Sequence, residues 1–347
     1  MNVLVINTGS LSSKVSVIEM PSEKTILSLK IDKSGNSAKC TIDGKPFNKI
    51  NSLDKALLMI RNASKIDFIT HRFVHGLDIM NPLPINNHSL RKLKNLTEFA
   101  PIHNAISLKA INESLKIFPK TQHLAVFDTS FHSTIPKENY LYPIPLIYYE
   151  KYKIRKYGFH GISLRYCLKE SEKILKKQKP SLIVCHLGGG SSVTAIKSGK
   201  SVDTTMGFSP ISGLFMGTRS GDIDVSIIPF LARKEKMSPE DVLSILNEKS
   251  GFMALAGKKD FREIHQSAEK GNISSIQAMK MYENQLIKQI GAYKSFLQKV
   301  DAIVFTGAIG RGADYLRENL LKYFPDDVFI TIESREDISM ARDAYKY

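Results

Sequence analysis

The chain has no tryptophan, and only three cysteines occur among its 347 residues. Cys40, Cys167 and Cys185 are odd in number and far apart, which predicts free thiols in a reducing compartment rather than a disulfide framework. No CxxC pair indicates a metal site. No apolar run approaches the roughly 18 residues that a membrane-spanning helix needs. The first residues also lack the basic start and apolar stretch of a secretion signal. We therefore expect a cytoplasmic protein with no membrane partner.

Acidic residues are few beside basic ones, because 34 aspartates and glutamates stand against 49 lysines and arginines, a formal net charge of +15. Such an excess first suggests binding to nucleic acid. The lysines are scattered along the chain, however, and the sequence contains neither a zinc finger nor an aromatic RNA-binding motif. We expect no nucleic-acid partner, and a basic surface also attracts small anionic substrates.

Apolar segments typical of strands alternate with amphipathic segments typical of helices, which predicts an α/β fold. The expected strands are residues 3–6, 13–18, 67–70, 124–127, 182–185, 192–196, 302–305 and 328–332. The expected helices are residues 52–63, 102–117, 163–176, 224–233, 273–297, 313–323 and 337–345. Another helix is expected to start near Ser238, where Pro239 and Asp241 supply good capping chemistry, and Gly251 follows its last turn.

One pattern occurs twice. The chain reads VLVINTGSLSSKVSVIEM near its start and LIVCHLGGGSSVTAIKSG near its middle. Each segment is an apolar strand, a turn of glycine and serine, and a second alternating strand. A duplicated fold with one such hairpin in each lobe would produce this pattern, and chance similarity is the alternative. The length of the chain also favours two domains.

Three glycine-rich turns are candidate anion sites, at residues 7–14, 188–192 and 306–312. Glycine lets the backbone approach a ligand closely, and successive N–H groups form a concave site for an anion. None of the turns is a Walker loop. The third follows a strand and precedes a helix, where nucleotides often bind in α/β folds. Each turn taken alone could equally be an ordinary structural turn.

Four further segments carry charged groups: HRFVHG, FDTSFH, GFHG and GTRSGDID. Arg72 is a candidate ligand for carboxylate or phosphate oxygens, which match the arginine fork. Asp128 follows a strand, a place suited to magnesium or catalysis, although helix capping remains an alternative. His160 lies between glycines and is expected to face a cleft, with a structural loop role as the alternative.

Taken in order, these segments resemble the acetate kinase (acetokinase) family of the actin, sugar-kinase and Hsp70 superfamily. The resemblance covers nearly the whole chain and is most specific in SVDTTMGFSPISGLFMGTRSGDID, GFHG, APIHNA and the terminal ESREDISMARD. It implies an α/β, two-lobed, duplicated actin-like ATPase (ribonuclease H-like) fold with an interdomain cleft, and a homodimer. The implied lobes are residues 1–147, to which residues 333–347 return, and a nucleotide-binding lobe of residues 148–332.

The resemblance also assigns roles by position. The catalytic set that it implies is Asp128, Arg72, Arg219 and His160. The acetate pocket that it implies is Arg72, Val74, Ile102, Phe159 and Pro210. Implied nucleotide and phosphate contacts are Ser10, Ser12, Lys14, His186, Gly188, Gly189, Gly190, Asp260, Phe261, Arg262, Gly307, Ala308, Ile309 and Gly310. Implied metal contacts are Asn7 and Glu336.

The implied reaction is reversible, Mg²⁺-dependent phosphoryl transfer between ATP and acetate, giving acetyl phosphate and ADP, with Mn²⁺ as the alternative metal. Carboxyl pKa values lie near about 4, so acetate is already an anion at neutral pH and needs no general base. Catalysis then rests on positioning and on charge neutralisation. Asp128 and Glu336 are accordingly better interpreted as metal or water ligands than as bases.

The sequence departs from the family pattern in several places, and it is shorter than the family norm. The departures nearest to the implied site are Leu77, Leu164, Gly189, Ala308 and Arg311. A methyl group at Ala308 could narrow the adenosine slot, and Arg311 could favour pyrophosphate as the donor. The alternatives are therefore a pyrophosphate-dependent enzyme, a kinase of propionate or another short-chain acid, a hydrolase of acyl phosphates, and a non-catalytic nucleotide-binding relative.

Overall fold

The computed structural model describes residues 1–9, 12–32, 39–47 and 50–347, so Ser10 and the side chain of Ile102 lie outside the described part. Contacts divide the chain into two compact units. The first unit comprises Met1–Ser133, Gly161–Tyr166 and Arg335–Tyr347, and the second comprises Thr134–His160 and Cys167–Ser334. The lobe boundaries inferred from the resemblance stay a prediction.

The first unit contains a sheet with the strand order β5-β4-β3-β2-β1-β6-β8-β7. Strand β1 pairs antiparallel with β2 and parallel with β6, and β6 pairs parallel with β8. The strands are β1 (Asn2–Thr8), β2 (Ser12–Glu19), β3 (Lys24–Asp32), β4 (Lys39–Ile42), β5 (Lys45–Pro46), β6 (Phe68–Phe73), β7 (Leu83–Pro84) and β8 (Gln122–Phe127).

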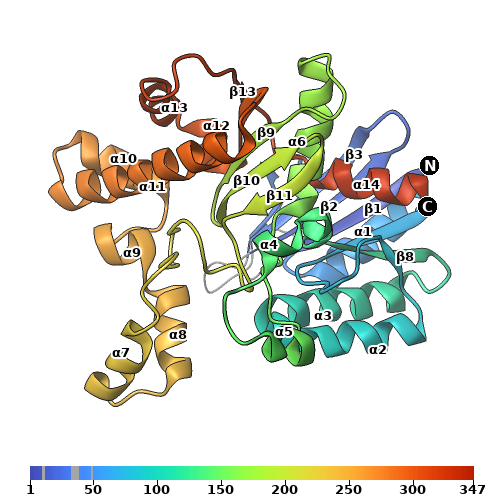
Figure 1. Ribbon diagram of the computed structural model, residues 1–347. Coiled ribbons are helices and arrows are strands. Elements are labelled where there is room, and N and C mark those ends of the chain that lie inside the picture. The colour runs from blue at the N-terminus through green and yellow to red at the C-terminus, as the bar shows by residue number, and fades with distance from the viewer. Residues whose placement is uncertain (10–11, 33–38, 48–49) are drawn as a thin grey trace. The chain divides into compact units, whose positions relative to one another are not determined.

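Helices cover both faces of this sheet. Because successive side chains in a strand point to opposite faces, β1 supplies apolar groups to both. Leu4 and Ile6 pack in the cluster that contains the apolar face of α1 (Leu53–Ala63), whereas Val3 and Val5 pack in the cluster that contains α14 (Glu336–Lys346). Figure 1 shows α14, in red, beside β1, in blue. The remaining elements of the unit are α2 (Asn87–Asn95), η1 (Leu96–Phe99), α3 (Pro101–Ile117), the start of η2 (Ser130–Thr134) and the first turns of α6 (Gly161–Ile174).

The second unit contains a sheet with the order β11-β10-β9-β12-β13. Its strands are β9 (Leu182–Leu187), β10 (Ser191–Lys197), β11 (Lys200–Thr204), β12 (Ala302–Thr306) and β13 (Phe329–Thr331). The long helix α11 (Ile273–Leu297) buries one stripe at helical spacing, including Tyr282, Leu286 and Ile290, in the same core as Ile183 and Cys185 of β9. The other helices are α4 (Lys137–Tyr140), α5 (Leu146–Tyr152), α7 (Ile227–Glu235), α8 (Pro239–Glu248), α9 (Gly251–Ala256), α10 (Phe261–Glu269), α12 (Gly307–Gly312) and α13 (Asp314–Leu321).

The two sheets share one topology. The run β3-β2-β1-β6-β8 and the run β11-β10-β9-β12-β13 each begin with an antiparallel hairpin and continue with parallel strands. The hairpins β1–β2 and β9–β10 are the two segments with similar sequences. The predicted α/β fold with a duplicated actin-like core is therefore confirmed. Within the described ranges, no helix is both long and apolar enough to cross a bilayer.

Local differences from the sequence analysis have local causes. Helix α7 starts at Ile227 rather than near residue 224, because Asp224 Oδ1 accepts hydrogen bonds from the backbone N–H and hydroxyl of Ser226 at 2.8 and 2.6 Å. Gly251 begins α9 instead of ending α8. Its φ is +61°, and an added Cβ would lie 2.0 Å from the carbonyl oxygen of Met216. The strands and α-helices that were not predicted are β3, β4, β5, β7 and β11 and α2, α4, α5, α9, α10 and α12.

A buried histidine pair joins β6 to β8. His71 and His123 are 1% and 3% exposed, and His71 Nε2 lies 3.0 Å from His123 Nδ1. His123 Nε2 lies 3.1 Å from the carbonyl oxygen of Phe118, which can only accept, so this nitrogen carries the proton. His123 Nδ1 then accepts from His71 Nε2–H. Burial lowers the pKa of both rings, and proximity to His123 lowers that of His71 further.

This pair predicts a loss of stability in mild acid. The pKa values of the two histidines are depressed in the folded state. Below the ordinary value of 6.5, these histidines therefore bind protons in the unfolded chain but stay neutral in the folded chain. The free energy of unfolding should therefore fall as the pH falls below that value, by at most about 1.4 kcal/mol per pH unit for each histidine. Urea unfolding at pH 7.5 and 5.5 measures this. His71→Leu should show a shallower pH dependence, with the exposed His88→Gln as control; equal slopes for all three proteins would contradict the prediction.

Candidate functional site

In the first unit, an ion pair lies where two parallel strands end. Arg72 is in β6 and Asp128 directly follows β8, and the carboxyl ends of these strands meet at one edge of the sheet. Arg72 Nε and Nη2 donate to Asp128 Oδ2 at 2.9 and 2.5 Å. The Asp128 carboxylate is buried and the Arg72 side chain is 19% exposed. One guanidinium nitrogen, Nη1, points elsewhere.

Asn7 extends this pair toward the carboxyl-terminal helix. Arg72 Nη1 donates to Asn7 Oδ1 at 3.2 Å, and Asn7 Nδ2 donates to Glu336 Oε2 at 2.7 Å. Asn7 is in β1 and Glu336 is the first residue of α14. The structure thus brings four predicted site residues into one hydrogen-bonded chain, Asp128–Arg72–Asn7–Glu336. Lys14 is the cross-strand partner of Asn7 and is exposed, and Ser12 begins β2.

The charges in this chain are strongly coupled. Burial raises the pKa of Asp128 and the Arg72 guanidinium opposes that rise. For Arg72, burial alone would lower the pKa, but the carboxylates of Asp128 and Glu336 outweigh it and raise the pKa. Asp128 Oδ1 has no hydrogen-bond partner among the residues that the structure describes. The guanidinium therefore stays charged, and one carboxylate oxygen is left for a ligand.

The donor set fits Mg²⁺ in its usual protein mode. In the described part of the chain no group of three or more His, Cys, Asp or Glu side chains could hold a metal by itself. Mg²⁺, however, is usually bound through one or two carboxylates, with substrate phosphates and waters filling the other positions. Asp128 Oδ1 and the Glu336 carboxylate offer that smaller set, with Asn7 beside them.

Asn104 holds the loop that follows Arg72. Its Oδ1 accepts from the backbone N–H of His75 at 3.1 Å, and its Nδ2 donates to the carbonyls of His75 and Leu96 at 3.1 and 2.7 Å. Val74 in this loop is 5% exposed. Leu77 in this loop adopts a left-handed φ of +51°. Sequence reasoning gave Asn104 no role, although the quoted segment APIHNA contains it.

In the second unit, His160 lies against the second glycine-rich turn. Its ring stacks on His186 of β9 with centroids 4.1 Å apart, and its Nδ1 lies 3.0 Å from the hydroxyl of Ser192 in β10. A Cβ added at Gly190 would lie 2.9 Å from His160 Nε2 and 3.7 Å from Arg219 Nη1. Only glycine therefore lets the turn approach both side chains. The structure brings His160, His186, Gly190 and Arg219 together.

The loop of Pro210 joins this group through backbone contacts. Arg219 Nη1 donates to the carbonyl of Pro210 at 3.2 Å. The carbonyl of Gly207 accepts from the backbone N–H of Tyr157 at 3.0 Å and of Gly158 at 3.2 Å, so the MGFSP and GFHG segments are tied together. Phe159 is 2% exposed. Two predicted pocket residues are thus attached to this group: Phe159 precedes His160 in the sequence, and the carbonyl of Pro210 accepts from Arg219.

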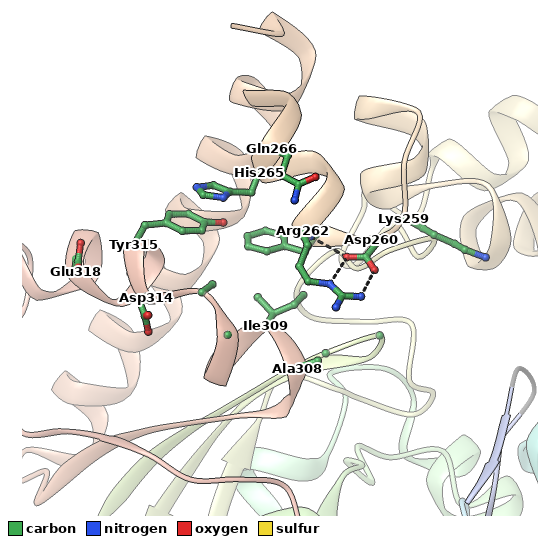
Figure 2. Close-up of a pocket in the computed structure, with 15 residues that line it drawn as sticks. Lys259, Asp260, Arg262, His265, Gln266, Ala308, Ile309, Asp314, Tyr315 and Glu318 are labelled. Carbon is green, nitrogen blue, oxygen red and sulfur yellow. Dashed lines mark hydrogen bonds and ion pairs between the residues drawn. The ribbon is translucent and has the colours of Figure 1, made fainter. Parts of the chain in front are cut away.

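A cavity of about 750 Å³ opens beside the third glycine-rich turn, and Figure 2 shows its lining. Asp260 caps α10 by accepting from the backbone N–H of Arg262 at 2.9 Å, and their side chains form an ion pair. His265 of α10 and Tyr315 of α13 stack in parallel with ring centroids 3.8 Å apart. The cavity brings together the predicted residues Gly188, Gly189, Asp260, Phe261, Arg262, Ala308 and Ile309. His265 and Tyr315 were missed, because nothing in the sequence places them opposite one another.

The strand-to-helix turn below the cavity depends on glycine. Gly307 has φ +80°, and an added Cβ would lie 2.4 Å from the carbonyl oxygen of Leu187. Gly310 packs against β9 and β12 and lies outside the cavity lining. Arg311 is also outside the lining, and its Nη1 pairs with Glu333 at 2.8 Å. At Gly189 a Cβ would meet nothing within 4 Å, so the fold itself does not impose glycine there.

Comparisons with known proteins agree along the whole chain. A model of the Acetokinase family matches residues 2–335. An acetate kinase of Carboxydothermus hydrogenoformans is 39% identical over 345 residues, covering 93% of this chain and 87% of that protein. A propionate kinase from Francisella tularensis superposes with a TM-score of 0.92 and 32% identity, covering 99% of this chain and 98% of that one. An acetate kinase from Porphyromonas gingivalis gives 0.89 and 29%, covering 99% of each chain.

The Gly307 turn yields a prediction about stability. Gly307→Ala places a Cβ at positive φ and against the Leu187 carbonyl, whereas Gly312→Ala meets no atom within 4 Å. We expect Gly307→Ala to lower the free energy of unfolding by about 2 kcal/mol or more, since the left-handed conformation alone costs an alanine about 1–2 kcal/mol. Gly312→Ala should change it by less than about 1 kcal/mol. Urea unfolding of both variants decides this, and equal midpoints would contradict it.

Proposed function

The chain belongs to the acetokinase family, and from that premise we propose that it is an acetate kinase that transfers a phosphoryl group reversibly between ATP and acetate. The observation that carries this is the family match over residues 2–335, together with relatives of about 39% identity that span nearly the same length. The hydrogen-bonded chain Asp128–Arg72–Asn7–Glu336 and the group of His160, His186 and Arg219 support it. The products are acetyl phosphate and ADP.

The reaction needs charge control rather than proton transfer. One oxygen of the acetate anion attacks the γ-phosphorus in line, the bond to the oxygen bridging the β- and γ-phosphates breaks, and ADP leaves with that electron pair. No proton moves, so no base is needed. The obstacle is the approach of one anion to another, and fixed cations remove it. Arg72 and Arg219 are the cations that we assign to this role, with His160 as a further hydrogen-bond donor.

We assign Mg²⁺, with Mn²⁺ as an alternative, to Asp128, Glu336 and Asn7, where the ion would neutralise phosphate charge. Asp128 is unsuited to act as a base, because Oδ2 already accepts two hydrogen bonds from Arg72. Its buried carboxylate instead fixes the direction of the guanidinium. Ser12, Lys14 and the second turn, Gly188–Gly190, remain proposed phosphate contacts.

The cavity favours ATP over pyrophosphate as the donor. Its volume, about 750 Å³, lies in the range of about 300–1,000 Å³ that holds organic ligands. Phe261, Ile309 and the stacked pair of His265 and Tyr315 provide apolar and aromatic walls, which suit a base and are of no use to pyrophosphate. Arg311, the residue that would favour a more highly charged donor, is paired with Glu333. The methyl group of Ala308 lines the cavity without closing it.

We also propose a cytoplasmic homodimer, by analogy with the family. Exposed apolar side chains on the helical pair α7–α8 offer a surface that a second copy would cover. Phe230 of α7 and Leu243 of α8 are 52% and 46% exposed, and Val225 just before α7 is 79% exposed.

The direct test is an activity matrix with Mg²⁺. We expect acetyl phosphate from acetate with ATP and none with pyrophosphate. Propionate should be a weaker substrate, because one extra methylene in a small apolar pocket changes binding by about 1–3 kcal/mol. The specificity constant for each donor and acid is the measured quantity. Activity with pyrophosphate alone would refute the ATP assignment, and a higher value for propionate would make the chain a propionate kinase. Acyl phosphate consumed without ATP formation would indicate a hydrolase.

The two arginines give a mutational test. Arg72→Ala and Arg219→Ala should each lower kcat by about 10²- to 10⁴-fold, the usual loss for one preorganised charge contact at a transition state. The exposed Arg91→Ala on α2 is the control and should keep the wild-type rate. Circular dichroism establishes that each variant is folded. A folded variant with normal turnover would remove that arginine from the mechanism.

A further inference from the structure

Helix α14 carries two carboxylates about two turns apart on one face, since residues at this spacing in a helix nearly eclipse one another. Glu336, at the first turn, accepts from Asn7. Asp343, further along, is 9% exposed and pairs with Arg165 of α6. Arg165 Nη1 lies 2.7 and 2.6 Å from the two Asp343 carboxylate oxygens.

The same arginine reaches the Asp128 loop. Arg165 Nη2 donates to the hydroxyl of Ser130 at 3.0 Å, and that hydroxyl donates to the carbonyl of Phe127 at 2.8 Å. The first turn of α6 makes a second contact with the loop, because the backbone N–H of Gly161 donates to the carbonyl of Asp128 at 2.9 Å.

These contacts close a ring. From Asp128 it runs through Arg72 and Asn7 to Glu336, along α14 to Asp343, and through Arg165 and Ser130 back to the Asp128 loop. All of its members lie in the first unit. One half of the ring consists of residues with proposed roles in the reaction. The other half, Asp343, Arg165 and Ser130, has no such role, yet it links the helix that carries Glu336 to the loop that carries Asp128.

We propose that Arg165 is a positioning residue that fixes the Asp128 loop relative to the helix carrying Glu336, and so sets the affinity of this carboxylate pair for a divalent metal. The inference rests on the proposed function in one respect, namely that Asp128 and Glu336 bind the metal. Arg165 touches neither substrate nor metal in this role. Its effect is to fix the distance between the carboxylates of Asp128 and Glu336. Residues that hydrogen-bond to metal ligands commonly have this effect.

If Arg165 had a purely structural role, its loss would lower stability without changing metal affinity. The chain contains a matched control for that case. Arg342 precedes Asp343 on α14 and makes an equally close double ion pair with Glu23, at 2.6 and 2.8 Å. This pair ties α14 to the segment between β2 and β3, and the Arg342 guanidinium also lies over the ring of Tyr166 in α6, 5.2 Å from its centroid. Neither Glu23 nor Tyr166 belongs to the Asp128 loop. Arg342→Met should therefore lower stability without altering the carboxylate pair.

The experiment compares Arg165→Met with Arg342→Met in the full chain. Mn²⁺ binding is measured by electron paramagnetic resonance in the presence of ADP, alongside the Mg²⁺ dependence of kcat, the KM for acetate and the melting temperature. Arg165→Met should weaken Mn²⁺ binding and raise the Mg²⁺ concentration for half-maximal rate by about 10- to 100-fold, the usual effect of losing an outer partner. The KM for acetate should change little. Arg342→Met should keep the wild-type metal affinity.

A double variant, Arg165→Met with Asp343→Leu, guards against simple unfolding, because an apolar pair can replace a buried ion pair without loss of stability. We expect its melting temperature to recover while metal binding stays weak. Wild-type Mn²⁺ affinity in either Arg165 variant, or no Mn²⁺ binding by the wild type, would overturn the proposal. A wild type that binds Mn²⁺ but forms no acetyl phosphate would refute the proposed function alone, and the titration would still decide the role of Arg165.

Discussion

The buried contact between Arg72 and Asp128 is the interaction on which the polar half of the first unit depends. A carboxylate as buried as Asp128 is tolerated only with a charged partner, and removal of one partner from such a pair costs about 3–5 kcal/mol because the other charge is left alone. The pair also decides where the remaining hydrogen bonds go. With Nε and Nη2 committed to Asp128, Arg72 Nη1 meets Asn7, and Asn7 in turn orients Glu336. One ion pair thus aligns side chains from three neighbouring parallel strands and a helix.

The second unit has the same sheet topology but a different set of groups around its turns. Its hairpin β9–β10 places a glycine turn against His160 and Arg219, and its parallel strand β12 ends in the Gly307 turn beneath the cavity. Helices α10 and α13, which line the cavity, lie outside the strand pattern that the two units share. Duplication therefore supplied the scaffold twice, and the segments inserted between equivalent strands gave each copy its own chemistry. The conserved part is the strand order, and the specialised part is what lies between the strands.

Much of this could be predicted from the sequence because the determinants are local. Eight predicted strands coincide with strands of the two sheets, seven of them interior and one, β13, at an edge, and α11 spans the predicted residues 273–297. The quoted motifs also contain Arg72, Asp128, His160 and Arg219, which the structure places in two compact groups. Asn104, Arg165 and the His265–Tyr315 stack escaped prediction for a common reason. Each contacts a partner that is distant in the sequence; Arg165 and Asp343, for example, are 178 positions apart. No local sequence pattern predicts such a contact. Side-chain roles at Ser10 and Ile102 lie outside the described residues and stay predictions.

The place of α14 has a consequence for the order in which the molecule can form. The face of the first sheet that contains Val3 and Val5 is completed by Met340, Ala341 and Ala344 of α14. During synthesis, β1 and β2 are made first, but their second face, which Ile162 of α6 also contacts, stays incompletely covered until residues 336–346 follow, after the second sheet has been synthesised. An uncovered apolar sheet face is a site for aggregation. The unit that contains the earlier strands is therefore completed last, and its apolar face needs protection until residues 336–346 are available to cover it.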